Sequence, residues 1–170
     1  MKTCLFFILA IVLVQCKCSS ADLISTTCDQ TPNDNLCIST LKRDPRSRKA
    51  DVAGLGLIMI DAVKIKATSA LDQITKIQKS NSLLKNSLME CSENYNLILK
   101  SDIPKSIRSF RENPKLAENG MAASAVEAQG CENSLRGSKI SPDFTQLNQS
   151  VYELSNIARA IIRAIRDRRL

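Results

Sequence analysis

The chain has 170 residues, a formal net charge of +7 at pH 7, and neither histidine nor tryptophan. A chain of this length can form one domain with a modest core, built mainly from Leu, Ile, Val, Ala and Met because aromatic residues are scarce. The lack of histidine excludes Ser-His-Asp and Cys-His nucleophiles and every zinc site that uses histidine. A lysine or carboxylate base would remain, but no pairing of residues indicates one. We therefore expect neither an enzyme, nor a cofactor, nor a metal site.

The N-terminus has the features of a secretory signal peptide. Lys2 provides the positive start, residues 5–14 form an unbroken apolar run of ten, and small residues follow up to Ala21. Ten apolar residues are too few to cross a bilayer, which favours a cleaved signal over a membrane anchor. We therefore predict a signal peptide over 1–21 and a secreted mature domain over 22–170, with no membrane contact after cleavage.

Four cysteines remain after cleavage: Cys28, Cys37, Cys91 and Cys131. An even number in the secretory pathway predicts two disulfides, with three connectivities open. The simplest pattern pairs Cys28 with Cys37 and Cys91 with Cys131.

The segment 22–49 is polar and contains Pro32 and Pro45 together with the close cysteine pair. It is expected to form short helices or turns, stapled to each other and packed on the main body. The apolar side chains available for that contact are Leu36, Ile38 and Leu41.

A long helix is expected over 50–79. Its first half is apolar nearly all round, which predicts burial on more than one side, whereas the later apolar residues share one sector. Gly54 and Gly56 count against a regular first turn. The apolar residues of the first half are Leu55, Leu57, Ile58, Met59, Ile60, Ala62, Val63 and Ile65.

A second helix is expected from Ser82 to about Phe110. Pro104 must kink or interrupt it, because proline removes a backbone donor. The apolar positions step at three- and four-residue intervals: Leu84, Leu88, Cys91, Tyr95 and Ile98, then more weakly Ile107 and Phe110.

Two more helices follow the break at Asn113-Pro114. The third is expected over 115–135, where alanine and glycine permit close approach to a neighbour, and the fourth follows the loop that ends at Pro142. The predicted buried face of the third is Ala117, Met121, Ser124, Ala128, Cys131 and Leu135. The predicted seam of the fourth is Leu147, Val151, Leu154, Ala158, Ile161 and Ile165.

Four amphipathic helices with short connections predict an all-α fold, an up-down-up-down four-helix bundle with an N-terminal extension. Cys91 and Cys131 fall on the apolar faces of consecutive helices, so a disulfide between them would clamp that pair.

These residues resemble the plant invertase inhibitor and pectin methylesterase inhibitor family over essentially the whole mature chain. Cys28, Thr31-Pro32 and Cys37 resemble its N-terminal cysteine pattern, and 51–57 is similar to the start of its first bundle helix. The spacing of Cys91, Tyr95 and Cys131 is similar to that of its second cysteine pair. The resemblance implies an N-terminal helical hairpin on the bundle, and disulfides that pair the first cysteine with the second and the third with the fourth.

Within the family, the stretch that starts at Asn113 is similar to the invertase-inhibitor branch. That branch carries a Pro-Lys-Phe motif between the second and third bundle helices, which engages the active site of an acid invertase. Here Pro114 and Lys115 match, and Leu116 replaces the phenylalanine.

The motif makes physical sense as an inhibitory tip. A retaining glycosidase holds two carboxylates about 5–5.5 Å apart in a pocket shaped for a polyol, and an ammonium on a flexible stem suits such a site. The hypothesis gives Lys115 the role of charge partner, Pro114 that of conformational lock and Leu116 that of apolar anchor.

Three alternatives stay open. Asn113-Pro114 is also an ordinary helix-start signal, in which case Lys115 is a solvated surface cation. The target could be pectin methylesterase, bound through the bundle helices. From another class, the protein could be a secreted ligand-carrying or signalling bundle.

The remaining features concern modification, partners and location. Asn148-Gln149-Ser150 is a glycosylation sequon at the start of the fourth helix. The C-terminal basic residues either oppose the helix dipole or hold the protein on acidic cell-wall polysaccharide: Arg159, Arg163, Arg166, Arg168 and Arg169. Nucleic-acid binding is not expected, because aromatics are scarce and motifs are missing. The predicted location is the apoplast or cell wall, with the vacuole as the alternative.

Overall fold

The computed structural model describes residues 20–167, without the side chains of Ser20 and Ser82. Residues 1–19 of the predicted signal peptide, and Arg168 and Arg169, lie outside the described residues. Within 20–167 every regular element is helical, as the sequence predicts. The elements are α1 (Ser20–Cys28), α2 (Asp34–Arg43), a 3-10 turn η1 (Pro45–Lys49), α3 (Val52–Ser80), a 3-10 turn η2 (Ser82–Leu84), α4 (Lys85–Leu97), a π-helical turn η3 (Ile98–Asp102), α5 (Ile103–Ser109), α6 (Pro114–Ser134) and α7 (Pro142–Asp167).

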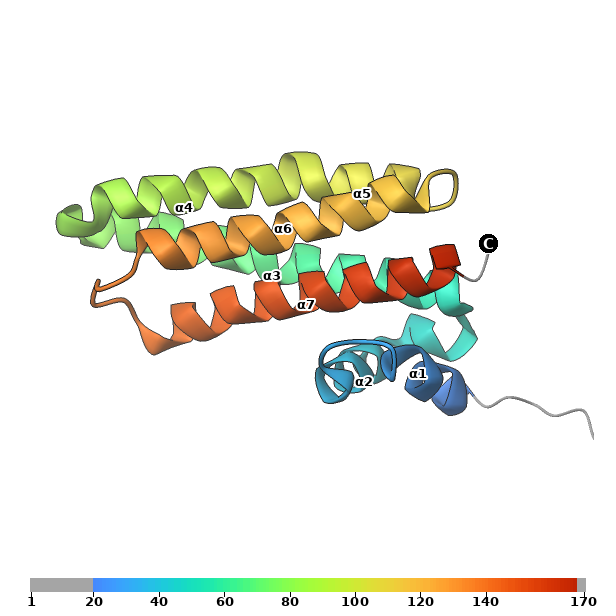
Figure 1. The fold of residues 1–170 in the computed structure, drawn as a ribbon. Coiled ribbons are helices and arrows are strands. Elements are labelled where there is room, and N and C mark those ends of the chain that lie inside the picture. The colour runs from blue at the N-terminus through green and yellow to red at the C-terminus, as the bar shows by residue number, and fades with distance from the viewer. Residues whose placement is uncertain (1–19, 168–170) are drawn as a thin grey trace, which may run out of the picture.

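The four rods of the bundle are α3, the continuous α4–η3–α5, α6 and α7. They run side by side in an up-down-up-down arrangement (Figure 1), which confirms the predicted fold class. The expected face of α6 is buried along its whole length, and in α7 only Leu147 of the predicted seam stays partly exposed. Among the described residues, no helix is long and apolar enough to span a membrane.

The N-terminal extension is a helical hairpin that packs on α3 and α7 (Figure 1). Cys28 at the end of α1 is bonded to Cys37 in α2, and the Asn33 side chain caps α2 by accepting from the Leu36 N–H. Leu41 is fully buried, whereas Leu36 and Ile38 pack on the core from its edge. The hairpin explains why the first half of α3 is apolar on several sides, since it covers a surface that the bundle leaves open.

Helix α3 begins regularly, so the expectation that its glycines disturb the first turn is wrong. The Asp51 side chain caps the helix by accepting from the Gly54 N–H at 2.7 Å. Gly56 lies against the Phe110 ring, and a methyl group in its place would sit 2.8 Å from that ring. Glycine is needed there for close packing between helices.

Pro104 is accommodated without a break in the second rod. The turn before it widens into the π-helical η3, in which the Ile103 N–H donates to the Ile98 carbonyl oxygen five residues back. Pro104 then lies in the first turn of α5, where the missing N–H of a proline costs little. Ile107 beyond it is 42% exposed, so the weak continuation of the pattern fails at this residue while Phe110 is buried.

Candidate functional site

The predicted tip lies at the turn between α5 and α6. Asn113 caps α6 by accepting from the Leu116 N–H at 3.1 Å, and Pro114 is the first residue of the helix. A proline fits this position because its fixed φ is helical and its missing N–H would have no partner there. Pro114, Lys115 and Leu116 therefore form the first helical turn of α6 rather than an irregular loop.

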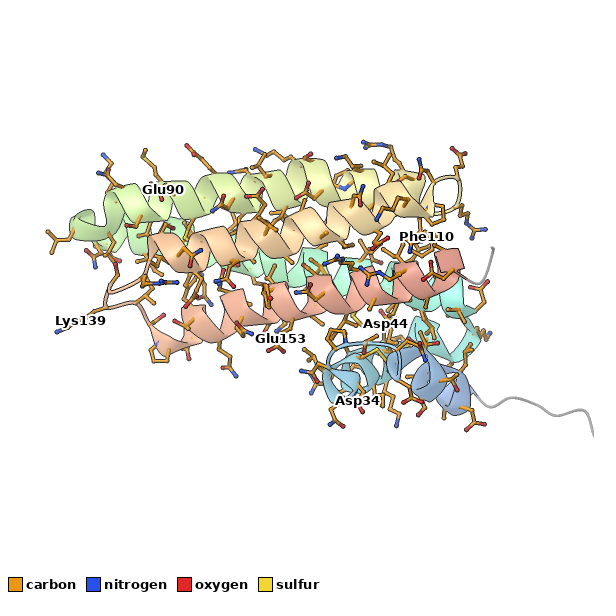
Figure 2. The ribbon with its side chains drawn as sticks, viewed as in Figure 1. Asp34, Asp44, Glu90, Phe110, Lys139 and Glu153 are labelled. Carbon is orange, nitrogen blue, oxygen red and sulfur yellow. A yellow bond between two sulfur atoms is a disulfide. The ribbon has the colours of Figure 1, made fainter. Side chains whose placement is uncertain are left out.

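This turn is at one extremity of the bundle, next to the C-terminal end of α7 (Figure 1). The Lys115 side chain is 59% exposed and Leu116 is 38% exposed. Phe110 and Lys139 lie toward opposite ends of the bundle in Figure 2, with Phe110 toward the end that holds the tip. The tip thus presents one cation and one apolar side chain on a backbone that the helix holds rigid.

Directly behind the tip, four cations surround one buried carboxylate. Glu118 is only 2% exposed, and Lys115 lies one helical turn before it, with 3.3 Å between Lys115 Nζ and Glu118 Oε2. From α7, Arg163 donates to Glu118 Oε1 through Nε at 3.0 Å and Nη2 at 2.9 Å. Arg166 donates to Glu118 Oε2, and Arg159 Nε is 3.8 Å from Oε1. We call these five residues the Glu118 cluster.

The Glu118 cluster keeps its carboxylate charged. Burial alone would raise the pKa of Glu118, but hydrogen bonds from Arg163 and Lys115 and the charge of Arg166 outweigh it, so this pKa lies below the usual value. The four cations, Glu118 and Asp167, which pairs with Arg166, leave a net charge of about +2 at this end of the bundle.

The sequence analysis missed Glu118. It expected the α7 arginines only to oppose the helix dipole or to bind acidic polysaccharide. The signal was present in the spacing: Arg159, Arg163 and Arg166 recur at four and three residues, on one face of a helix. A cationic stripe on a packed helix requires an anionic neighbour. Which helix supplies it depends on the register of α6 against α7, which the spacing does not contain.

A disulfide and a network of hydrogen bonds stabilise the second half of the bundle. Cys91 of α4 is bonded to Cys131 of α6, the simplest pattern open to the sequence. Nearby, the Tyr95 hydroxyl donates to Asn148 Oδ1 at 2.7 Å, and Asn148 Nδ2 donates to the Ala128 carbonyl oxygen and to Glu132 Oε2, both at 3.2 Å.

The position of Asn148 corrects the glycosylation hypothesis. Asn148 is 2% exposed, and its Nδ2, the atom that would carry a glycan, donates both hydrogen bonds to α6. A glycan replaces one of the two Nδ2 hydrogens, so one of the two α6 acceptors would lose its donor, and the sugar would have to lie between packed helices. The folded structure therefore argues against glycosylation of Asn148, which faces inward from α7.

A second buried carboxylate, Asp102, lies in the π-helical turn η3. It is 6% exposed, and its Oδ2 has no hydrogen-bond partner. The pKa of Asp102 is raised to about 6, mainly by burial and also by the charge of Glu127 of α6, while Lys105 of α5 partly opposes the shift. No group of three or more Cys, Asp or Glu residues within 20–167 could hold a metal ion.

Comparisons with known proteins agree with this architecture. Residues 22–161 match the family model of the plant invertase/pectin methylesterase inhibitor. The cell wall/vacuolar inhibitor of fructosidase 1 of Arabidopsis thaliana is 42% identical over 144 residues, which cover 84% of this chain and 69% of that protein. The pectinesterase inhibitor of Actinidia deliciosa is 31% identical over 143 residues, which cover 82% of this chain and 76% of that protein.

A solved structure shares the fold. The crystal structure of a mutant form of a pectin methylesterase inhibitor from Arabidopsis superposes with a TM-score of 0.72 and 18% identity, over 82% of this chain and 95% of that chain. The match over 22–161, with both disulfides and the helical hairpin in place, leads to one conclusion: the chain belongs to the plant invertase/pectin methylesterase inhibitor family.

Proposed function

We propose that this protein is a secreted inhibitor of a plant acid invertase (β-fructofuranosidase), which occludes the enzyme's active site with the first turn of α6. The proposal rests chiefly on Lys115 and Leu116, which project from the end of the bundle on a turn that Asn113 and Glu118 hold in place. It is supported by the 42% identical relative, which is named as a fructosidase inhibitor.

Electrostatics favour insertion of Lys115 into an acidic pocket. The ion pair between Lys115 and Glu118 is largely exposed on the lysine side, so releasing Lys115 costs little. Arg163 and Arg166 continue to neutralise Glu118 when Lys115 turns toward the enzyme. The remaining positive charge complements a site that holds two carboxylates, and it would speed association with that site.

The same proposal covers catalysis, processing and location. The protein acts by binding, without a cofactor and without catalysis of its own, in line with a family of inhibitor proteins. The mature chain begins near Asp22 after removal of the signal peptide. It acts in the apoplast or cell wall, with the vacuole as the alternative. The 42% identical Arabidopsis relative is named as a cell wall/vacuolar protein.

The test is a titration of the disulfide-bonded mature protein against an acid invertase and a pectin methylesterase at mildly acidic pH. Stoichiometric loss of sucrose hydrolysis is expected, and Lys115→Ala should weaken inhibition by about 30-fold or more, the usual effect of deleting one partner of a desolvated charge pair. Lys139→Ala, in the exposed loop at the opposite end of the bundle (Figure 2), is the matched control and should inhibit like the parent.

Inhibition of pectin methylesterase is the second candidate. It is favoured by Leu116, which replaces the aromatic residue of the invertase-inhibitor motif, and by the 31% identical pectinesterase inhibitor. In that case the esterase alone would lose activity, and Lys115→Ala would inhibit as well as the parent because the helices would form the contact. A secreted ligand carrier or signalling bundle would leave both enzymes active.

A further inference from the structure

A groove runs between the N-terminal hairpin and α7, and it shares Arg159 and Arg163 with the Glu118 cluster behind the tip. It has a volume of about 540 Å³, within the range of about 300–1,000 Å³ that is typical of small-molecule sites. The hairpin turn contributes Gln30 and Asn33, and α7 contributes Tyr152, Asn156, Arg159 and Arg163. We call this feature the hairpin groove. It combines amide side chains, one phenol ring and two guanidinium groups.

The hairpin groove also contains one carboxylate. Glu153, which Figure 2 places on the part of α7 near the hairpin, accepts from Asn33 Nδ2 at 3.3 Å and from Gln149 Nε2 at 2.9 Å. Both donors are neutral amides, so Glu153 keeps its negative charge. Two guanidinium groups against one carboxylate still leave the lining of the groove with a net positive charge.

The two arginines differ in how well they are satisfied. Arg163 donates two hydrogen bonds to Glu118, whereas Arg159 makes only a 3.8 Å ion pair with it. The Arg159 Nε atom is buried without a hydrogen-bond partner, although the side chain as a whole is 40% exposed. Arg159 also lines a second groove of about 410 Å³ between α6 and α7, together with Tyr152 and Asn156. An unsatisfied guanidinium thus lies where two grooves meet.

We propose that the hairpin groove binds an acidic saccharide, a short chain of uronate sugars. A planar guanidinium pairs well with a carboxylate, and Arg159 has donors available for one. The amides of Gln30, Asn33 and Asn156 can donate to and accept from sugar hydroxyls, and the amphipathic ring of Tyr152 can lie against a sugar ring.

The rest of the molecule favours the same ligand class. The mature chain carries 22 Lys and Arg against 17 Asp and Glu, a net charge of +5, because the predicted signal peptide removes two lysines and no acid. Such a charge concentrates polyanions at the surface. Arg159 and Arg163 are the arginines of α7, among the described residues, that line the groove together with the amides of the hairpin turn.

The test measures binding of trigalacturonate to the disulfide-bonded protein by calorimetry at low ionic strength, with maltotriose as the neutral analogue. Trigalacturonate should bind, and maltotriose should bind at least about tenfold more weakly. Arg159→Gln should reduce the affinity about tenfold, and it leaves Glu118 bound by Arg163, Arg166 and Lys115. Asn156→Ala, which preserves the charge, should reduce the affinity several-fold.

The matched control is Arg108→Gln, which removes the same charge from an exposed position on α5 and should change the affinity less than about twofold. Equal losses for Arg108→Gln and Arg159→Gln would mean diffuse charge attraction and would overturn the site. Binding of polygalacturonate without binding of the trimer would overturn it as well. If an acidic hexapeptide bound more tightly than trigalacturonate, and Asn156→Ala did not change its affinity, the saccharide proposal would be overturned in favour of a protein partner. No enzyme enters this assay, so its result is separate from that of the inhibition test.

Discussion

Two carboxylates are buried where α6 packs on its neighbours, and their pKa values shift in opposite directions. Glu118 lies between α6 and α7 with four cations around it, and its pKa is lowered. Asp102 lies in the π-helical turn on the side of the second rod, with one unpartnered oxygen, and its pKa is raised to about 6. The difference shows that burial alone does not decide whether the pKa of a carboxyl group rises or falls. The number of cations that face the group decides the direction of the shift.

The comparison predicts opposite responses to pH. Asp102 has a folded-state pKa above its unfolded value of 3.8, so its ionisation opposes folding above about pH 6, and this penalty is relieved as the pH falls toward 4. Glu118 has a folded-state pKa below 4.5, so its contribution is present above that pH and is lost only as the pH falls through the lowered value. At mildly acidic pH the protein therefore loses the penalty of Asp102 and keeps the Glu118 cluster.

The largest expected effect belongs to the hydrogen-bond network around Asn148, which involves neither of the two buried carboxylates. Asn148→Ala removes the acceptor of the Tyr95 hydroxyl and two donors to α6, and should lower the free energy of unfolding by about 3–4 kcal/mol at pH 7. Denaturant unfolding measures it. Ser150→Ala, which destroys the same sequon but leaves the network intact, is the control and should change stability little.

Asp102→Asn should stabilise the protein at pH 7, because it removes a buried charge without a partner. The gain is at most about 3 kcal/mol, from a shift of about two pKa units, and it should shrink as the pH falls below 6 and vanish near 4. Unfolding curves across this pH range measure it against Asp72→Asn, an exposed change on α3. A gain independent of pH would mean that the pKa of Asp102 does not differ between the folded and the unfolded protein.

Glu118→Gln should destabilise the protein by about 2 kcal/mol at neutral pH, because Arg163 and Arg166 lose a charged acceptor. The loss is no larger because both arginines are partly exposed to solvent. The difference in the free energy of unfolding should narrow as the pH falls through the lowered pKa of Glu118, where the parent also becomes neutral at this site. Inhibition of invertase should change little, because Lys115 leaves Glu118 when it turns toward the enzyme. Glu112→Gln, an exposed neighbour in the same turn, is the control and should leave stability unchanged.

The smallest expected effect concerns the apolar half of the tip. Leu116→Phe should tighten inhibition of invertase about three- to tenfold, because an aromatic ring adds contact area and stacking worth about 0.5–1.5 kcal/mol. Inhibition constants at mildly acidic pH measure the change. The same substitution at Leu97, which is 49% exposed on α4, should leave inhibition unaltered. Equal constants for both variants would place the contact elsewhere.

Much of the fold could be predicted because its causes are local. Apolar spacing identified the buried face of α6, Asn113-Pro114 marked the helix start, and the even cysteine count limited the disulfides. The failures have two causes. Gly54 and Gly56 counted against a regular first turn because the local cap from Asp51 was overlooked. The sequon at Asn148 gave no sign that Tyr95, 53 residues away, holds this side chain inside the bundle.

The candidate site divides in the same way. The tip of Pro114, Lys115 and Leu116 is contiguous in the chain, so its residue types and its place between two helices were predictable. Glu118 and Arg163 are 45 residues apart, and their contact depends on how α6 is rotated against α7. Binary patterning predicts which side of a helix is buried, but not which neighbour each residue meets.

The sequence by itself determined four amphipathic helices, a disulfide-compatible cysteine pattern and a basic tip, and it predicted secretion, because periodicity, capping and composition act over a few residues. Only the tertiary structure decided that four cations share Glu118, that Asp102 lacks a partner and that Arg159 opens into a polar groove. These outcomes depend on side chains from separate helices within a few ångströms of each other. Packing register sets those distances, and no local pattern encodes it.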